Sequence, residues 1–162
     1  MSTNYWIFKV EDEENAKYRR RGIDLYQHRM SESFWSIQEI TETGKMTPHI
    51  NELKDGDQVL FYQVNPLGSR FLGTCVLASG YTKLDEETSK KLLHPEFIDL
   101  NQGVFLRDIH KWNKPLPAEQ LKGKDSFFRG GKNFGSFFKG NIKQIKTREE
   151  YEAIISEHNL TQ

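Results

Sequence analysis

Apolar and polar residues along the chain form a series of short blocks, most of which predict β-strands. Four blocks are rich in aromatic and β-branched residues, at 4–10 (NYWIFKV), 58–64 (QVLFYQV), 70–79 (RFLGTCVLAS) and 103–112 (GVFLRDIHKW). A loop that contains proline and glycine, residues 65–69, joins the second block to the third. This pair therefore predicts a β-hairpin.

Two shorter blocks extend the predicted sheet. Residues 34–37 (FWSI) are an apolar run that follows a polar connector at 24–33, and we expect this run at a sheet edge. Residues 142–145 predict a final short strand. The strand at 103–112 is expected to close there, because two prolines follow at positions 115 and 117.

Helical signals lie between these blocks. Residues 11–21 place acids in a first turn and basic residues in a last turn before Gly22, which is the charge order that a helix dipole favours. The other signals are one or two turns after Pro48, a segment at 85–93 that Pro95 stops, and a capping box at 147–150 that opens a helix over Tyr151, Ile154 and Ile155. The pattern predicts a small α+β domain, with three or four short peripheral helices around a curved mixed β-sheet or partly open β-barrel of five or six strands.

Length and composition narrow the class of protein. A chain of 162 residues is long enough to build one hydrophobic core without a metal or disulfide staple. Its one cysteine, Cys75, excludes an intramolecular disulfide and fits a reducing compartment, so we expect a cytoplasmic protein. Acidic residues interrupt the first 17 residues before a secretory apolar segment forms, and no stretch approaches the roughly 20 apolar residues of a spanning helix. No contact with a membrane is expected.

The charges cancel over the whole chain but not along it. The 23 basic and 23 acidic residues give a net charge of zero, yet the segment 120–148 holds eight basic residues against one acid, Asp125. Five phenylalanines and five glycines alternate with these basic residues. Lysine and arginine replace counterions on phosphates and ring faces accept bases, so the segment fits nucleic-acid binding. A solvated basic loop anchored by its phenylalanines is an equally weighted alternative.

Sequence signals for a metal site or a catalytic site are weaker than the signal for nucleic-acid binding. The five histidines are far apart and show no zinc-ligand spacing. Asp108 and His110 share one face of a predicted strand, where two surface residues are commoner than an acid/base pair. The Gly130-Gly131-Lys132 sequence lacks the spacing of a phosphate loop. No metal or cofactor is therefore expected.

The order of these blocks resembles the EVE domain family and, more distantly, the YTH domain family, both of which have a PUA-like fold. The resemblance rests on NYWIFKV, the segment ending in RRRG, FWSI, LKDGDQVLFYQV, FLGTCVLASGY, GVFLRDIHKW and the closing FGSFFKGNIKQIKTREEYEAI. It covers residues 4–157, so one EVE/PUA-like domain is expected over that range.

The resemblance implies a module that holds one modified, methylated base, flipped out of its strand, in an aromatic cage. The Trp35-Ser36 pair fits the tryptophan and serine of the YTH cage, and Asn15 fits its asparagine. An earlier asparagine of that pattern is replaced by Glu11. Tyr81 and Phe97 are the candidates for further cage walls. Arg129, Lys132 and Lys139 are the candidates for phosphate contacts.

Three classes of function follow for testing. The first is a non-enzymatic reader of modified bases in DNA or RNA, with restriction or RNA-processing proteins as candidate partners. The second is an RNA-acting enzyme of the ASCH type that would use Asp108, His110 and Lys111, although the GxKxxExR motif of that family is missing. The third is a protein-interaction module whose aromatic residues all belong to the core.

Overall fold

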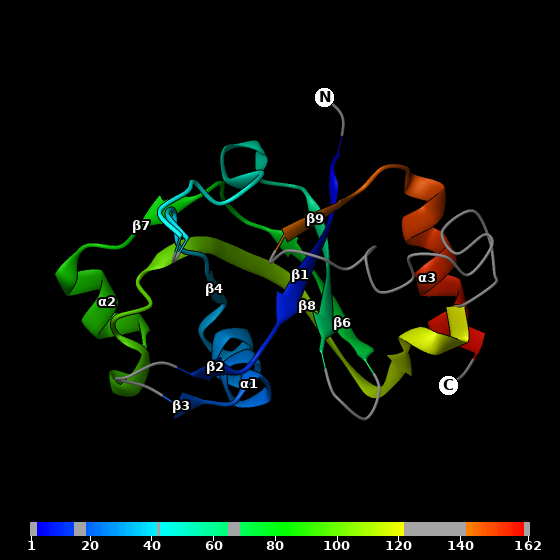
Figure 1. Ribbon diagram of the computed structural model, residues 1–162, viewed down its shortest axis with the longest axis horizontal. Helices are drawn as coiled ribbons and strands as arrows, with labels where there is room; N and C mark the ends of the chain where they lie inside the picture. Colours follow the sequence, from blue (N-terminus) through cyan, green and yellow to red (C-terminus); the bar gives the residue numbers. More distant parts are fainter. Residues whose placement is uncertain (1–2, 15–18, 42, 65–68, 122–141, 161–162) are drawn as a thin grey trace.

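The computed structural model describes residues 3–14, 19–41, 43–64, 69–121 and 142–160. Seven strands of these segments form a curled mixed sheet in the order β4-β8-β6-β5-β1-β9, with β7 paired to β8 (Figure 1). The strands are β1 (Tyr5–Val10), β4 (Phe34–Ser36), β5 (Gln58–Gln63), β6 (Arg70–Leu77), β7 (Thr82–Lys83), β8 (Gln102–Pro117) and β9 (Ile142–Ile145). The sheet and its helices have the expected α+β architecture of a half-open barrel.

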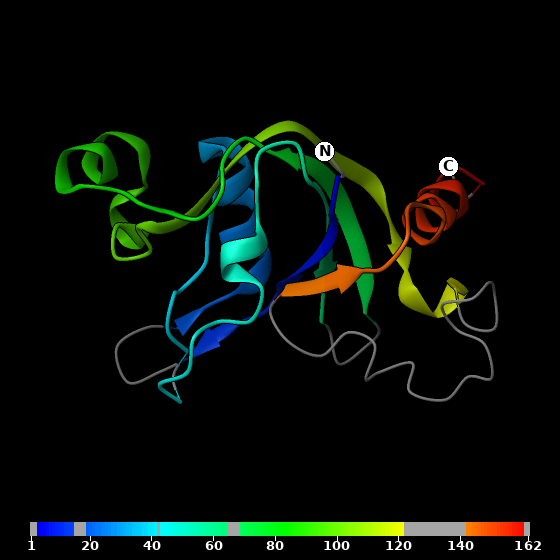
Figure 2. The same ribbon diagram turned by 90° about the horizontal axis from the view of Figure 1, so that it is seen from above.

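Three α-helices surround the sheet in the described segments. They are α1 (Gly22–Glu32), α2 (Glu86–Leu92) and α3 (Arg148–Leu160), and short 3-10 turns lie at Ile50–Glu52, Pro95–Phe97 and Ala118–Leu121. Figure 2 shows α1 and α3 on opposite sides of the sheet. These helices are too short and too polar to cross a bilayer.

Alternation along the central strands divides the apolar residues between the two sides of the sheet. Trp6, Phe8 and Phe61 belong to the core under α1, whereas Ile7 and Leu60 belong to the core under α3. Successive side chains of a strand point to opposite faces, so β1 and β5 each serve both cores. Strand β1 pairs with β5 in parallel, and Trp6 lies opposite Val59. Paired residues of the two strands therefore point to the same side of the sheet.

The predicted helix at 11–21 is wrong. The described residues of this region form a short antiparallel pair, β2 (Glu13–Glu14) and β3 (Arg19–Arg20), with Glu13 opposite Arg20. The order of acidic and basic positions that suggested a helix dipole is therefore not a sufficient helix signal, because charge order carries no strand or helix period.

The polar connector predicted at 24–33 is also wrong, because this segment is the helix α1. Tyr26 and Met30 are buried one helical turn apart, and Arg29 is buried beside them. The helix begins at Gly22, whose backbone N–H donates to the Asp12 carboxylate at 2.7 Å. A Cβ on Gly22 would lie 2.8 Å from the carbonyl carbon of Glu11, so this close approach requires glycine.

The other predicted elements are confirmed, with one change of length. The first strand, the hairpin of β5 and β6, the helix α2, the strand β9 and the helix α3 lie where the pattern placed them. The Thr147 hydroxyl accepts a hydrogen bond from the Glu150 N–H at 3.1 Å, as a capping residue does. Strand β8 continues through Pro115 and Pro117, beyond the predicted end. Among the described strands its second half pairs with β6 alone, and an edge position tolerates the missing N–H of proline.

Candidate functional site

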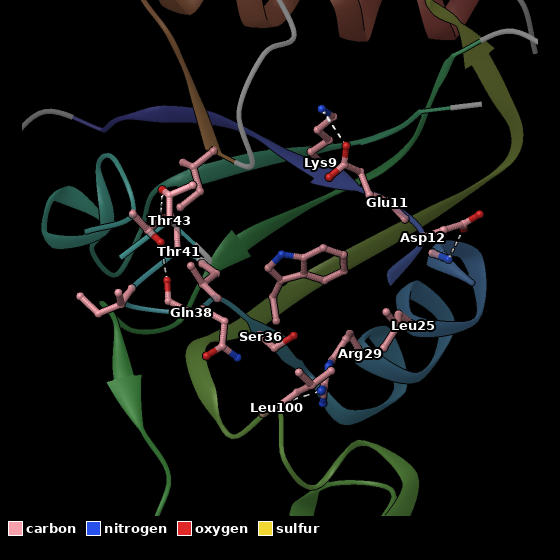
Figure 3. A pocket seen from close by; sticks show the side chains of 17 residues that line it. Lys9, Glu11, Asp12, Leu25, Arg29, Ser36, Gln38, Thr41, Thr43 and Leu100 are labelled. Atoms are coloured by element: carbon pink, nitrogen blue, oxygen red, sulfur yellow. Dashed lines mark hydrogen bonds and ion pairs between the residues drawn. The ribbon is translucent and has the colours of Figure 1, made fainter. Parts of the chain in front are cut away.

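A cavity of about 500 Å³ opens between the end of β1, helix α1, strand β4 and the loop that follows β4. Figure 3 shows its lining, with Lys9, Glu11 and Asp12 on one side and Ser36 and Gln38 on another. The lining residues are Lys9, Val10, Glu11, Asp12, Gly22, Leu25, Arg29, Trp35, Ser36, Ile37, Gln38, Ile40, Thr41, Thr43, Thr47, Leu100 and Ile142. The cavity thus combines one indole with a wall that is otherwise aliphatic or polar.

Trp35 is partly exposed and contributes the aromatic part of this lining. Behind it, the ring of Phe61 lies 4.9 Å from the indole and the ring of Phe8 lies 6.3 Å away at an interplanar angle of 25°. The edge of Tyr26 packs against it from α1 at 6.4 Å. These contacts hold the indole at the cavity wall without burying it in the core.

Gly103 places β4 close enough to β8 to form this wall. It lies opposite Ser36 in the antiparallel pairing of the two strands. A Cβ on Gly103 would lie 1.9 Å from the carbonyl oxygen of Trp35 and 2.9 Å from the Ile37 nitrogen. No side chain fits there, so the position of Trp35 depends on glycine at the facing site.

Gln102 holds the chain that leaves β4. The Ile37 N–H donates to the Gln102 carbonyl at 2.7 Å, and the Glu39 N–H donates to its side-chain oxygen at 2.9 Å. The Tyr81 hydroxyl donates to the same side-chain oxygen at 2.5 Å. The Thr47 hydroxyl donates to the Gln38 carbonyl and ties the far end of the loop to its start. Hydrogen bonds from the backbone and from the side chains of Gln102 and Thr47 therefore hold the loop that forms the polar wall of the cavity.

The structure brings together some of the predicted cage residues and separates others. Trp35 and Ser36 both line the cavity. Tyr81 packs against the same core but reaches the cavity wall only through Gln102, and burial raises the pKa of its hydroxyl. Phe97 is 5% exposed and packs against His28, with ring centroids 4.9 Å apart, so it does not line the cavity. Asn15, Arg129, Lys132 and Lys139 lie outside the described residues.

Several lining residues were not predicted from the sequence. Arg29 is 1% exposed, and its guanidinium donates to Glu32 at 2.7 Å and to the Leu100 carbonyl at 3.3 Å. The i,i+3 spacing of this ion pair is a helix signal, but the polar character of 24–33 outweighs it in the sequence and predicts a connector. Asp12 and the threonines of the loop have no signal in the sequence that links them to Trp35.

The charged groups of the described lining are partly paired. The Lys9 ammonium lies 2.8 Å from a Glu11 oxygen, and the Arg29 guanidinium is bound to Glu32. Glu11 and Asp12 are both exposed. The described rim is thus not positively charged, in contrast to the expected rim, whose predicted residues precede Ile142 in the chain and lie outside the described residues.

No protein-family model matches the sequence, and no curated protein matches it significantly. Solved structures match nearly all of it. The DUF55 domain of human thymocyte nuclear protein 1 has a TM-score of 0.64 at 16% identity, with 96% of this chain and 99% of that chain covered. The human THYN1 protein in complex with DNA that contains 5-methylcytosine has a TM-score of 0.62 at 14% identity, with 96% and 98% covered.

A third match is the YTH domain of Zygosaccharomyces rouxii MRB1 in complex with N6-methyladenosine RNA, with a TM-score of 0.57 at 12% identity over 96% of this chain and 86% of that chain. The chain has the PUA-like fold of the EVE and YTH domains. The resemblance seen in the order of the sequence blocks is thereby confirmed at the level of the fold. In this PUA-like fold, Trp35 and Ser36 lie next to each other on the short strand β4.

Tyr26 supports Trp35 by its ring and not by its hydroxyl. The side chain is 4% exposed, its hydroxyl has no hydrogen-bond partner among the described residues, and burial raises its pKa. We expect Tyr26→Phe to leave the free energy of unfolding unchanged or to raise it by up to about 1 kcal/mol, because it removes a buried unbonded polar group. Urea denaturation measures the difference.

The matched control is Tyr62→Phe. The Tyr62 hydroxyl has a hydrogen bond with Ser69, and we expect its loss to cost about 1 kcal/mol. A destabilisation of Tyr26→Phe as large as that of Tyr62→Phe would show that the Tyr26 hydroxyl is bonded in solution.

Proposed function

We propose that this chain binds one methylated base, flipped out of a DNA or RNA strand, in the Trp35 cavity, and that it does so without catalysing a reaction. The observation that supports the proposal is the partly exposed indole of Trp35 on the wall of a cavity of about 500 Å³. That volume falls in the range of about 300–1,000 Å³ that is usual for small-molecule sites. The rigid rings behind the indole keep its accessible part available for stacking.

The known complexes of the same fold agree with this proposal. The THYN1 structure holds DNA with 5-methylcytosine and the YTH structure holds RNA with N6-methyladenosine. Asp108 and His110, the best residues of the enzyme alternative, do not line the Trp35 cavity. They lie on β8, and Asp108 is exposed beside Arg107 at 3.3 Å. The geometry thus favours binding at Trp35 over catalysis at Asp108.

Energetics predict that the cavity alone binds weakly. Stacking a base on an aromatic ring contributes about 1–3 kcal/mol, comparable to the few kcal/mol that flipping a base out of a duplex costs. Contacts to phosphates must supply the rest, and the basic segment 120–148 is the candidate, with Arg129, Lys132 and Lys139 as its proposed contacts. The proposal therefore includes affinity that falls steeply as the salt concentration rises.

Replacing the indole tests the proposed site. We expect Trp35→Ala to weaken the binding of a methylated oligonucleotide by roughly tenfold or more, because it removes the stacking surface. Fluorescence anisotropy with labelled oligonucleotides that carry 5-methylcytosine, N6-methyladenine or no modification, at low salt, measures the affinity.

Trp112→Ala is the matched control. Trp112 is also partly buried, but it stacks on His158 at 3.6 Å, between β8 and α3, and does not line the cavity. This variant should bind as the unchanged protein does. If Trp35→Ala folds and retains full affinity, the site is elsewhere; if no oligonucleotide binds at low salt, the proposed function is wrong.

A further inference from the structure

Carboxylates stand at the cavity that holds Trp35. Glu11 and Asp12 line it from the end of β1, and the Glu11 side chain is 46% exposed. Two cations also line it, but the Arg29 guanidinium is bound to the Glu32 carboxylate and the Leu100 carbonyl. The Lys9 ammonium is paired with Glu11 at 2.8 Å. The described lining therefore offers more accessible negative than positive charge.

This charge distribution disfavours an anionic group and favours a cation inside the cavity. A carboxylate near an indole attracts a cation twice, once by its own charge and once because the face of the indole carries negative electrostatic potential. The separation from bulk water within a cavity strengthens both attractions. A phosphate would instead be repelled by Glu11 and Asp12, so the strand is expected to hold its phosphates away from this side of the cavity.

The hydrogen-bonding capacity of Glu11 also restricts the kind of base that fits the cavity. An ionised carboxylate only accepts hydrogen bonds, and its two oxygens offer about four lone-pair sites, so Glu11 can accept N–H donors in addition to its contact with Lys9. Glu11 therefore suits a base edge that presents N–H groups. The Watson–Crick edge of guanine presents two such groups side by side, N1–H and the N2 amino group.

We propose that the base read at Trp35 is one whose ring carries a positive charge through N-methylation, with Glu11 as the residue that selects it. N7-methylguanine represents this class, because it joins a cationic ring to an edge of N–H donors. The inference rests on the proposed function and specifies its substrate class. It differs from a general preference for methyl groups, since 5-methylcytosine and N6-methyladenine are neutral.

Isothermal titration calorimetry with free nucleosides tests the preference apart from any phosphate contact. The probes are 7-methylguanosine, guanosine, 5-methylcytidine and N6-methyladenosine. We expect 7-methylguanosine to bind roughly tenfold more tightly than the three neutral nucleosides, the size of effect that a desolvated cation–π contact gives. Trp35→Ala should abolish the difference.

Two variants with opposite expected effects on the preference for 7-methylguanosine test the role of Glu11. Glu11→Gln keeps the length of the side chain and removes its charge, so the preference for 7-methylguanosine should fall several-fold while 5-methylcytidine binds as before. Lys9→Gln frees Glu11 from its ion pair and should strengthen the preference. Glu39→Gln is the matched control, because Glu39 is a nearby carboxylate that does not line the cavity and pairs with Lys83 at 3.2 Å.

The outcomes separate this inference from the proposed function. If methylated oligonucleotides bind through Trp35 but 7-methylguanosine shows no advantage, or if Glu11→Gln leaves its advantage intact, the cationic class is wrong and the base-binding function stands. If no nucleoside and no oligonucleotide binds, both are wrong. If a peptide with trimethyllysine binds at Trp35 more tightly than every nucleoside, the cavity reads a cation on a protein, and both proposals about nucleic acid are overturned.

Discussion

Replacing Asp57 with alanine is expected to lower the free energy of unfolding by about 3–5 kcal/mol, because one buried and two partly buried donors lose their acceptor at once. Asp57 is 0% exposed. Its carboxylate accepts hydrogen bonds from the Asn4 N–H at 3.0 Å, the Trp6 indole N–H at 2.9 Å and the Lys54 N–H at 3.2 Å. It therefore joins the turn before β5 to the start of β1, and β1 carries one side of the cavity.

Chemical denaturation followed by circular dichroism measures this loss. Asp57→Asn is expected to destabilise the domain as well, because its amide nitrogen would face donors where the carboxylate accepted, although its volume is nearly the same. The matched control is Asp55→Ala, two residues away. The Asp55 side chain is 69% exposed and lies 3.4 Å from Arg107, so we expect a change of about 1 kcal/mol or less. A similar small change for Asp57→Ala would contradict the role of the buried carboxylate.

Replacing Gly103 with alanine is expected to destabilise the domain by about 2–6 kcal/mol and to abolish base binding, since it adds a steric conflict to backbone strain. The added Cβ would lie 1.9 Å from the carbonyl oxygen of Trp35, and the backbone φ of Gly103 is 155°. Strand β4 cannot keep its pairing with β8 under such a conflict. Because β4 carries Trp35, the indole would leave the cavity wall.

Gly44→Ala separates the steric effect from backbone strain. Gly44 also has a positive φ, 82°, but a Cβ there would meet no atom within 4 Å. We expect a loss of about 1–2 kcal/mol from strain alone and unchanged affinity for a methylated oligonucleotide. Stability and anisotropy measurements on both variants provide the comparison. If Gly103→Ala binds as well as Gly44→Ala, the approach of β4 to β8 does not position Trp35.

Local pattern predicted the strands because alternation is a property of the strand itself. Trp6 and Phe8 face one core and Ile7 faces the other, as the run NYWIFKV indicates. Pattern failed at α1, where Tyr26 and Met30 are the buried large apolar side chains, Ile23 is partly buried, and a buried Arg29 completes the buried face. A helix held mainly by tertiary contacts has a weak hydrophobic period, so 24–33 was predicted as a connector.

In the cavity too, some residues could be predicted from short sequence patterns and others could not. The Trp35-Ser36 pair was found from its sequence and its resemblance to the YTH pattern, and both residues line the cavity. The resemblance suggests Phe97 as a cage wall because it is an aromatic residue of the loop between Gly80 and Gln102, but it packs instead against His28 and His94. The positions of Glu11 and Asp12 in the same cavity as Trp35 depend on how the end of β1 meets α1, which no short pattern records.

The amino-acid sequence by itself determined the strand order along the chain, the α+β class, the resemblance to EVE domains and the place of Trp35 in a short strand. Those properties come from neighbouring residues, whose periodicity and turn chemistry act over a few positions. Tertiary structure alone decided the depth and the charge of the cavity. The reason is that β1, α1, β4 and the loop after β4 meet there only when the sheet curls, and Gly22 and Gly103 set how closely they approach.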